Sequence, residues 1–398
     1  MSRPTTDWEA RSLASLATYL NGFAFKPQHW GEEGLPIVRI RELLDPAVEP
    51  DRYDGPLAHD FKIHDGDLIF SWSATLAALF WDRGPAYLNQ HLFKVTPACD
   101  VDIRFLNHLI NFHLDRLSAR SHGTTMKHVT RGDLDGYMVE LPPASEQAAV
   151  AEILEALDDQ IRSMIKVVEK CRLRKIGLVD ELVDAARRAD LPVRSLGEIA
   201  SGRGGFIQTG PFGSQLHSSD YVNAGVPVVM PQDLSDGRVN LDSIAQVSET
   251  MARSLSRHRM LPGDVVFARR GDLGRCAEIN KREQGWLCGT GCLLVRTPPA
   301  VLTAGWLALV YRHELGQSHV RANAVGSTMA NLNSGILASL RLPVPPVANQ
   351  RNAVAVIEAH DRELSLEHQR LAKLYALKSA LATDLLSGRV RVPKGVAL

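Results

Sequence analysis

One passage occurs twice in this chain. The segment GTTMKHVTRGDLDGYMVELPPASEQ fills positions 123–147, and GSTMANLNSGILASLRLPVPPVANQ fills positions 326–350 of a 398-residue sequence. The alignment continues without a gap to Asp158 and Asp361, and eleven pairs of identical residues lie along it. Because an internal repeat of this length decides the fold before any local pattern does, we expect two copies of one unit, each about half the chain.

Shorter matches upstream extend the repeat. Positions 34–43 match 225–234 at an offset of 191 residues, and positions 64–73 match 261–270 at an offset of 197, against 203 for the long passage. Such drift is expected where loops of different length separate the matched blocks. The chain is therefore predicted to be a tandem duplication.

Each copy begins with a part that has the pattern of an α+β globule. Over roughly 8–140 and 192–343, short apolar runs alternate with Gly, Pro, Asn and Asp, which is typical of strands separated by turns. Apolar residues at spacings of three and four predict one helix over 103–117 and a second over 305–320. Both predicted helices precede the repeated passage.

The pattern changes after Pro142-Pro143 and Pro345-Pro346, where each copy becomes a long amphipathic segment. Ser145 is well placed to cap the first of these helices. A helix of about 40 residues spans ~60 Å and cannot bury its apolar stripe on a small globule alone. The apolar positions of the two stripes are Val150, Ile153, Leu157, Ile161, Met164, Val168, Cys171, Leu178 and Leu182, then Val354, Ile357, Leu364, Leu371, Leu374, Leu381 and Leu385.

The three-to-four alternation of these residues is that of a coiled-coil seam. If an approximate two-fold axis relates the copies, the two helices pack on each other as an antiparallel coiled coil with one globule at each end. Two alternatives stay open at this point: each helix could fold back on its own globule, or it could drive formation of a homodimer.

The composition excludes several classes of protein. An apolar share of 45% with 6% aromatic residues is ordinary for a soluble globular protein. No run of 18 apolar residues occurs, and the N-terminal MSRPTTDWEARS lacks the apolar stretch of a signal peptide, so we expect a cytoplasmic protein with no membrane partner. Five cysteines form an odd set without a disulfide framework, which suits a reducing compartment.

The sequence contains no motif of a known catalytic or metal-binding site. Cys276, Cys288 and Cys292 are close in sequence, but no second ligand pair completes a tetrahedral metal site, and buried thiols in strands are the simpler interpretation. The Asn-Pro-Pro-aromatic motif of adenine methylation, the G-x-x-x-x-G-K-[ST] phosphate loop and the dinucleotide-binding glycine pattern are all missing. We therefore expect no catalytic residues, no metal and no cofactor.

The order of globule, Gly-Thr-Thr-Met, Leu-Pro-Pro-x-x-Glu-Gln and long helix, repeated once and ending in LLSGRV, resembles the specificity (S) subunits of type I restriction–modification systems. The resemblance runs from Trp8 to about Val390, and GPFGSQLHSSDYVNAGVPVV (210–229) is similar to the opening of a target recognition domain. One departure is Asn349, where the family has an acidic residue before Gln.

The resemblance implies an α+β chain with two target recognition domains separated by two long helices, packed as an antiparallel coiled coil with a pseudo-two-fold relation. The implied boundaries are 1–143 and 191–346 for the recognition domains, 144–190 for the central helix, and 347–398 for the C-terminal helix and tail. It also implies a non-catalytic subunit that recognises a bipartite double-stranded DNA target, one half-site per domain, with the helices setting the spacer. Two methyltransferase subunits would dock on the helices, and restriction subunits that translocate DNA can join them.

A basic loop is the first candidate contact with DNA. The whole chain balances 45 basic against 45 acidic residues, but positions 200–325 carry 13 Lys and Arg against 10 Asp and Glu. Arg269, Arg270 and Arg275 follow an apolar strand, where they could hold phosphates or guanine edges, or form a solvated turn. In the first copy the aligned turn contains Ser71, Trp72 and Ser73, and different side chains at one fold position suggest different half-sites.

Two further groups complete the candidate DNA-binding residues. Gly213, Ser214 and Gln215 belong to a glycine-rich loop, and an amide such as that of Gln215 can recognise adenine. Thr125 and Lys127 in the first copy, and Thr328 and Asn331 in the second, lie just ahead of the long helices. Because polar residues recur at this place in both copies, we expect them to share one role, either binding phosphates or packing the globule on the helix.

Two other functions remain as alternatives. One is a coiled-coil scaffold that joins proteins without recognising DNA, and the other is a self-contained DNA-modifying enzyme. The missing motifs count against the enzyme.

Overall fold

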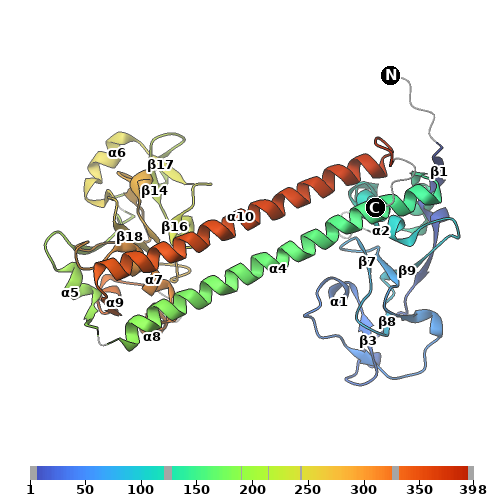
Figure 1. Cartoon of the computed structure of the whole chain (residues 1–398), viewed down its shortest axis with the longest axis horizontal. Coiled ribbons are helices and arrows are strands. Elements are labelled where there is room, and N and C mark those ends of the chain that lie inside the picture. Colours follow the sequence, from blue (N-terminus) through green and yellow to red (C-terminus); the bar gives the residue numbers. More distant parts are fainter. Residues whose placement is uncertain are drawn as a thin grey trace. The chain divides into compact units, whose positions relative to one another are not determined.

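The computed structural model describes residues 7–120, 128–189, 191–213, 215–242, 244–324 and 331–392 (Figure 1). It divides into two compact units. Unit 1 comprises Met1–Lys166 with Gln369–Leu398, and unit 2 comprises Val167–His368. The boundaries fall inside the two longest helices, α4 (Ala144–Arg188) and α10 (Val347–Leu386), so each unit contains part of both.

The globule of unit 1 contains ten strands and three short or medium helices among the described residues. They are β1 (Glu9–Ser12), β2 (Ala17–Asn21), β3 (Leu35–Val38), α1 (Ile40–Leu44), β4 (Arg52–Tyr53), β5 (Lys62–Ile63), β6 (Leu68–Ser71), β7 (Ala77–Phe80), β8 (Ala86–Leu88), β9 (Leu92–Pro97), α2 (Ile103–Arg120), α3 (Arg131–Asp135) and β10 (Met138–Leu141).

Two four-stranded sheets organise unit 1. The first has the order β2-β9-β6-β7 and is antiparallel throughout, and the second has the order β4-β3-β8-β5 with a parallel β3–β8 pair. Helix α2 packs on the first sheet, where Phe105 and Leu109 join Phe70 in one fully buried core. That core also includes Leu154 of α4 and Leu385 of α10, so the ends of both long helices are part of the globule.

The globule of unit 2 repeats this plan. Its elements are β11 (Val193–Ser195), α5 (Leu196–Ala200), β12 (Phe206–Thr209), β13 (Tyr221–Val222), β14 (Val226–Val229), β15 (Leu234–Ser235), β16 (Arg238–Val239), β17 (Ala245–Val247), α6 (Glu249–Ser254), β18 (Asp264–Ala268), β19 (Cys276–Glu278), β20 (Leu287–Cys288), β21 (Cys292–Arg296), α7 (Ala304–Arg312), α8 (Glu314–Asn323), α9 (Ser334–Ala338) and β22 (Arg341–Pro343). The sheet order β12-β21-β18-β19 matches β2-β9-β6-β7 of unit 1, and β14 pairs with β20 in parallel as β3 does with β8.

The prediction of one continuous helix over 305–320 is wrong. It is two helices, α7 and α8, which meet at His313. The backbone of His313 is extended, and its Nδ1 accepts a hydrogen bond of 3.0 Å from the Leu315 amide, so this residue ends one helix and caps the next.

The first long helix also begins one residue earlier than its predicted cap. Ser145 lies within α4, and the Pro143 carbonyl accepts the first hydrogen bonds, from the amides of Glu146 (2.9 Å) and Gln147 (3.0 Å). A cap at Ser145 predicts Glu146 as the first helical residue, so the observed start at Ala144 is a shift of two residues, within the usual uncertainty of a helix end.

No helix among the described residues is both long enough and apolar enough to cross a membrane.

Within each unit, the parts of α4 and α10 run side by side in opposite directions. In unit 1, Asp158 forms an ion pair with Lys378. In unit 2, Lys175 forms an ion pair with Asp361, with Nζ and Oδ1 2.6 Å apart. Asp158 and Asp361 are 203 residues apart, as are Lys175 and Lys378, so the two ion pairs occupy equivalent positions in the two copies of the repeat.

The glutamine at the start of each long helix fixes the helix to its globule in the same way. Gln147 accepts a hydrogen bond from the Asp102 amide at 2.8 Å and donates to the Asp100 and Pro142 carbonyls. Gln350 accepts from the Thr303 amide, also at 2.8 Å, and donates to the Val301 and Pro345 carbonyls. Both glutamines are buried, and this shared geometry makes Thr303 the counterpart of Asp102.

The residue before the glutamine differs between the copies. Glu146 accepts two hydrogen bonds of 2.7 Å from the Arg391 guanidinium and one of 3.2 Å from Trp8 Nε1. Gly388 (φ +69°) turns the chain after α10, and a side chain there would meet the Trp8 ring at 3.0 Å. Asn349, which replaces the acid in the second copy, carries no charge and cannot form such an ion pair.

Candidate nucleic-acid interface

The candidate residues gather at one edge of the main sheet in each unit. In unit 2, β12 and β18 are both antiparallel to β21, so the ends of β12 and β18 meet the start of β21. The Gly210 amide donates to the Cys292 carbonyl (2.9 Å), and the Arg269 amide donates to the Gly291 carbonyl (2.8 Å). The glycine-rich loop and the basic loop are therefore neighbours.

The structure also joins the basic loop to the segment that precedes α9 and α10. Arg269 is half-buried, and its Nε donates to Asn331 Oδ1 at 3.2 Å. The Leu332 amide donates to the Arg269 carbonyl at 3.0 Å. These two predicted site residues thus form a pair, although 62 positions separate them.

The two other arginines of the loop differ in their freedom. Arg275 is held by Asp272, with Nε and Oδ2 3.1 Å apart, and Leu273 anchors the loop because its carbonyl accepts a hydrogen bond from the buried Tyr311. Arg270 is exposed and forms no ion pair with any residue that the structure describes. Its guanidinium is the group most available to an external phosphate or base.

The glycine-rich loop is shaped by close backbone approach. A side chain at Gly210 would lie 2.0 Å from the Gly289 carbonyl oxygen, so only glycine fits there. Gln215 is exposed, but its Oε1 accepts the Phe212 amide at 3.0 Å, so a bidentate contact with adenine would have to replace that bond. Phe212, which has 58% of its surface exposed, projects from the same loop as Gly213.

The same edge of unit 1 is aromatic instead of basic. Trp72 follows β6 as Arg269 follows β18, and its carbonyl accepts the Val129 amide at 2.9 Å. The Trp72 ring lies 5.6 Å from that of His91 and 5.8 Å from that of His128. Trp72 Nε1 and the Nδ1 atoms of both histidines are buried and lack a hydrogen-bond partner among the described residues. Buried polar atoms without a partner are uncommon, which marks this cluster as a candidate functional site, although these three atoms would have to become exposed to contact an external group.

The serines that flank Trp72 do not face outward. Ser71 is fully buried and its hydroxyl donates to the Thr75 carbonyl at 2.6 Å, and Ser73 is 4% exposed. They shape the turn that positions Trp72. The predicted site residues Thr125, Lys127, Ser214 and Thr328 lie outside the described residues.

Sequence reasoning did not select His91, whereas it counted His128 with Thr125 and Lys127 among the polar residues just ahead of the first long helix. His128 belongs to the repeated passage and is the counterpart of Asn331, so the alignment itself was the signal for it. His91 lies just before β9, and only the antiparallel pairing of β9 with β6 brings it to Trp72. No local pattern could have identified it.

The described residues contain no group of three or more His, Cys, Asp or Glu that could hold a metal ion. Cys276, Cys288 and Cys292 are buried in the strands of unit 2, and burial raises the pKa of the Cys276 thiol to about 12. Such a thiol stays protonated at neutral pH and packs as a small apolar side chain.

Comparison with known proteins gives one family. The model described as type I restriction modification DNA specificity domain matches residues 5–169 and again 217–376. The type I restriction enzyme EcoBI specificity subunit of Escherichia coli is 25% identical over 305 residues. The aligned part is 69% of this chain but only 62% of the EcoBI subunit, so this chain spans less than two thirds of that relative. The MjaVIII specificity subunit of Methanocaldococcus jannaschii is 18% identical and is covered to 94%, with 98% of this chain aligned.

Solved structures share the fold. The type I restriction–modification S subunit from M. genitalium aligns with a TM-score of 0.58 at 16% identity, over 97% of this chain and 98% of that one. A chain from a type I system, solved to explain complex assembly and conformational transition, aligns with a TM-score of 0.61 at 20% identity, over 98% of this chain and 100% of that one.

Proposed function

Because the chain belongs to the type I restriction modification DNA specificity family, we propose that it is the non-catalytic subunit that selects the DNA sequence to be modified. Each globule would bind one half of a bipartite double-stranded target, and the long helices would set the unspecified gap. The protein would act in the cytoplasm with two methyltransferase subunits, which carry the chemistry, and restriction subunits would join where the system cleaves DNA.

The observation that supports this proposal is a pair of equivalent sheet edges with different side chains. The backbone bond from Val129 to Trp72 is repeated from Leu332 to Arg269, so the scaffold is the same in both copies. The groups that it presents are an aromatic cluster in one copy and a basic loop in the other. Two half-sites of different sequence require this combination, because phosphate contacts position a protein while side chains at base edges specify the sequence.

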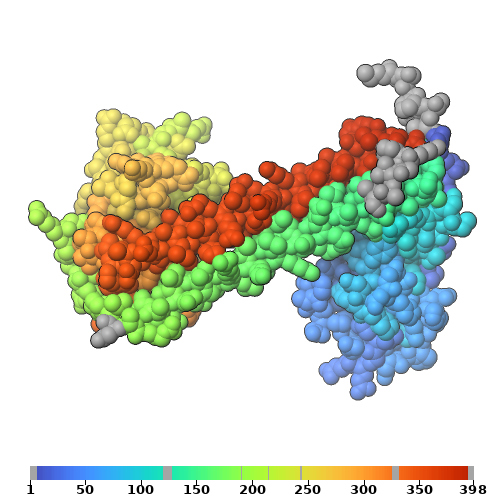
Figure 2. All heavy atoms as spheres, viewed as in Figure 1, coloured from blue at the N-terminus to red at the C-terminus, as the bar shows by residue number. Residues whose placement is uncertain are grey.

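Exposed apolar side chains on the long helices support docking of partner subunits there. Figure 2 shows side chains of α4 (green) and α10 (red) open on the face drawn. An exposed apolar patch, as distinct from scattered single residues, marks an interaction surface. The exposed apolar residues of the two helices are Ile165 and Leu377 in unit 1, and Val167, Leu173, Ile176, Val356 and Leu366 in unit 2, together with the amphipathic Tyr375 in unit 1.

A substitution in one globule tests whether each globule has its own half-site. Arg270→Ala should alter or weaken recognition of one half only, with a loss of ~1–3 kcal/mol of discrimination if the guanidinium contacts a base. If Arg270 instead holds a phosphate, affinity should fall on every sequence, and its dependence on salt should become shallower. Arg275→Ala is the matched control, because Asp272 already holds that side chain.

The measurement is sequencing of methylated positions in a host that expresses the complex, with DNA affinity measured on the purified complex. Unchanged specificity and unchanged affinity for Arg270→Ala would refute the placement of the interface at this loop. Exchange of residues 1–140 for the first globule of another family member should change one half-site and leave the other half and the gap intact. A chimera that changed both halves would contradict independent recognition.

A further inference from the structure

A cavity of about 320 Å³ lies in unit 2, away from the sheet edge that carries the candidate interface. The β15–β16 hairpin, β19, α7 and the first half of α10 enclose it. Its volume is at the lower end of the range for small-molecule sites. Two carboxylates face it from different elements, Glu278 from β19 and Glu358 from α10.

These two carboxylates form no ion pair. Neither Glu278 nor Glu358 is paired with any residue in the described part of the chain, whereas Asp361 is paired with Lys175 (2.6 Å) and Glu283 with Arg282 (2.7 Å). Burial and the negative charge of Glu358 raise the pKa of Glu278, and the positive charge of Arg238 lowers it in part. The cavity therefore contains two carboxylates that no cation contacts directly among the described residues.

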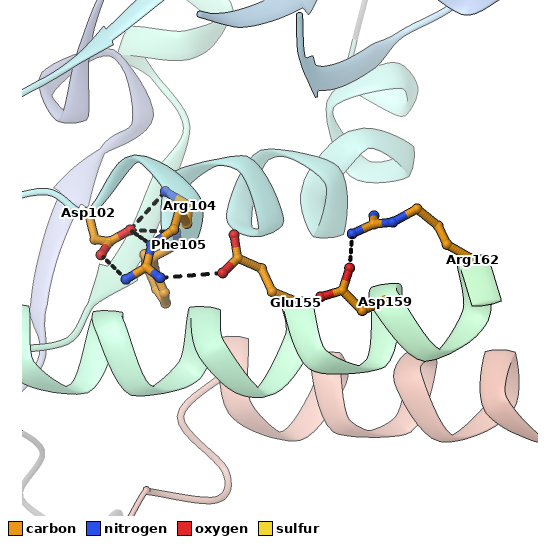
Figure 3. Close-up of polar contacts among 6 residues, drawn as sticks. All are labelled: Asp102, Arg104, Phe105, Glu155, Asp159 and Arg162. Carbon is orange, nitrogen blue, oxygen red and sulfur yellow. Dashed lines mark hydrogen bonds and ion pairs between the residues drawn. The ribbon is translucent and has the colours of Figure 1, made fainter. Parts of the chain in front are cut away.

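The first copy shows what offsets this charge there. Arg104 of α2 lies between two carboxylates, with Nη2 3.0 Å from Asp102 Oδ2 and Nη1 3.4 Å from Glu155 Oε2 (Figure 3). Glu155 is the counterpart of Glu358 in the repeat. A guanidinium thus bridges the globule and the long helix in unit 1.

The second copy lacks that cation and gains a further acid. Thr303 is the counterpart of Asp102, so Gly305 is the counterpart of Arg104. The strand registers Leu68–Phe80 and Val265–Glu278 make Glu278 the counterpart of an apolar Phe80. Glu278 Oε2 would be 3.0 Å from a Cβ atom at Gly305, so its carboxylate lies against the glycine.

We infer that this cavity binds a guanidinium group from outside the chain, held between Glu278 and Glu358 as Arg104 is held between Asp102 and Glu155. A guanidinium is planar and carries five donors, so it can bridge two carboxylates, which a single ammonium does less well. Val354 and Leu309 line the cavity and can pack against an alkyl chain. A metal ion fits less well, since no described cluster of His, Cys, Asp or Glu supplies three ligands.

Three arginines also line the cavity, and their charge has to be counted. Five acidic side chains line it, but Lys175 offsets Asp361 and Arg282 offsets Glu283. The remaining acids are Asp236, Glu278 and Glu358 against Arg238 and Arg312, an excess of one negative charge. Arg312 donates to the Ala308 carbonyl at 3.2 Å, and its guanidinium carbon would lie 2.8 Å from a Cβ atom at Gly237, so it packs against the hairpin. The cavity keeps a net attraction for a cation.

Titration calorimetry of the full-length chain with N-acetyl-L-argininamide tests the inference without DNA or any partner. The neutral citrulline analogue and the lysine analogue are the matched ligands, and we expect saturable binding that is strongest for the arginine compound. Glu278→Gln and Glu358→Gln should each weaken binding by at least about tenfold, because each removes a charge-assisted contact. Glu155→Gln, in the first copy, should leave binding unchanged. Absence of saturable binding, or wild-type affinity in both cavity variants, would overturn the inference.

A second variant fills the cavity from within. A side chain at Gly305 would meet Val354 at 2.9 Å, and the counterpart of Val354 is Ala151, so Gly305→Arg is combined with Val354→Ala. The double variant should melt at a higher temperature and lose binding of the arginine compound. A folded double variant that still binds the compound with wild-type affinity would also contradict the inference.

The source of the guanidinium is decided by assembly, the one measurement here that rests on the proposed function. If Glu278→Gln and Glu358→Gln weaken association with methyltransferase subunits, the group is an arginine side chain of that partner. If association is unchanged while binding of N-acetyl-L-argininamide is lost, the ligand is a free guanidinium compound.

Discussion

Removal of one partner of the Lys175–Asp361 ion pair should destabilise unit 2 more than a surface ion pair would. The two side chains are only 14% and 20% exposed, because they lie in the seam between α4 and α10. Truncation of one partner of a fully buried pair costs about 3–5 kcal/mol, and an exposed pair contributes about 0–1 kcal/mol. For this half-buried pair we expect Asp361→Ala to lower the free energy of unfolding by about 2 kcal/mol.

A double-mutant cycle isolates the interaction. Lys175→Ala, Asp361→Ala and the double variant should give a coupling energy of about 1.5 kcal/mol in denaturant unfolding followed by helical circular dichroism. The control is the Glu169–Arg172 pair on the same helix, whose side chains are 52% and 63% exposed and for which we expect at most about 0.5 kcal/mol. A coupling energy for Lys175–Asp361 no larger than that of the control would refute the reasoning.

Three further predictions concern the length of α4, the dependence of stability on pH, and the ion pair between Arg391 and Glu146. Insertion of four helix-forming residues after Glu169 lengthens α4 by ~6 Å, just over one turn, and should widen the unspecified gap by one or two base pairs at ~3.4 Å each, which methylation-motif sequencing would show. An active variant with an unchanged gap would show that the length of the helices does not set the gap. Burial, with Lys378 nearby, lowers the pKa of His108 to about 4, and burial lowers the pKa of His113 to about 4. Both values lie below the unfolded value of about 6.5, so the unfolded state binds protons first, and the free energy of unfolding should fall by about 2 kcal/mol per histidine between pH 7 and pH 5. His108→Gln should make the melting temperature less dependent on pH. Arg391→Ala should lower the free energy of unfolding of unit 1 by about 2–3 kcal/mol, because it leaves Glu146 without its cation. Adding Glu146→Asn should restore part of the loss. If it restores nothing, the packing of the Arg391 side chain on the Trp8 ring accounts for the loss instead.

Much of the architecture follows from the sequence because the repeat and the two apolar stripes are periodic. The repeat predicted two copies of one fold, and the alternation along α4 predicted which residues are buried, such as Leu157 and Ile161. The break at His313 was missed because apolar periodicity continues across it, and only the hydrogen bond of its side chain to Leu315 shows that a cap interrupts the helix.

The candidate site was predicted only in part, because its geometry depends on pairing between distant strands. Arg269 and Asn331 were both predicted as site residues, but no sequence pattern indicated that they bind each other across 62 positions. His91 was missed since it contributes through the β6–β9 pairing. The exchange of Arg104 for Gly305 could be recognised only after hydrogen bonds to Gln147 and Gln350 had fixed the alignment of α2 with α7.

The hydrogen bonds of Glu146 connect two parts of the chain that are far apart in sequence. Trp8 and Arg391 lie near the two ends of the polypeptide, and both bind this one carboxylate. At the corresponding place in the second copy, where Asn349 stands, Arg188 is instead followed directly along the chain by the next globule. A hydrogen-bonded junction in one copy thus occupies the position of a peptide linkage in the other. The same packing of globule on helix is thus compatible with a covalent connection in one copy and with a non-covalent one in the other.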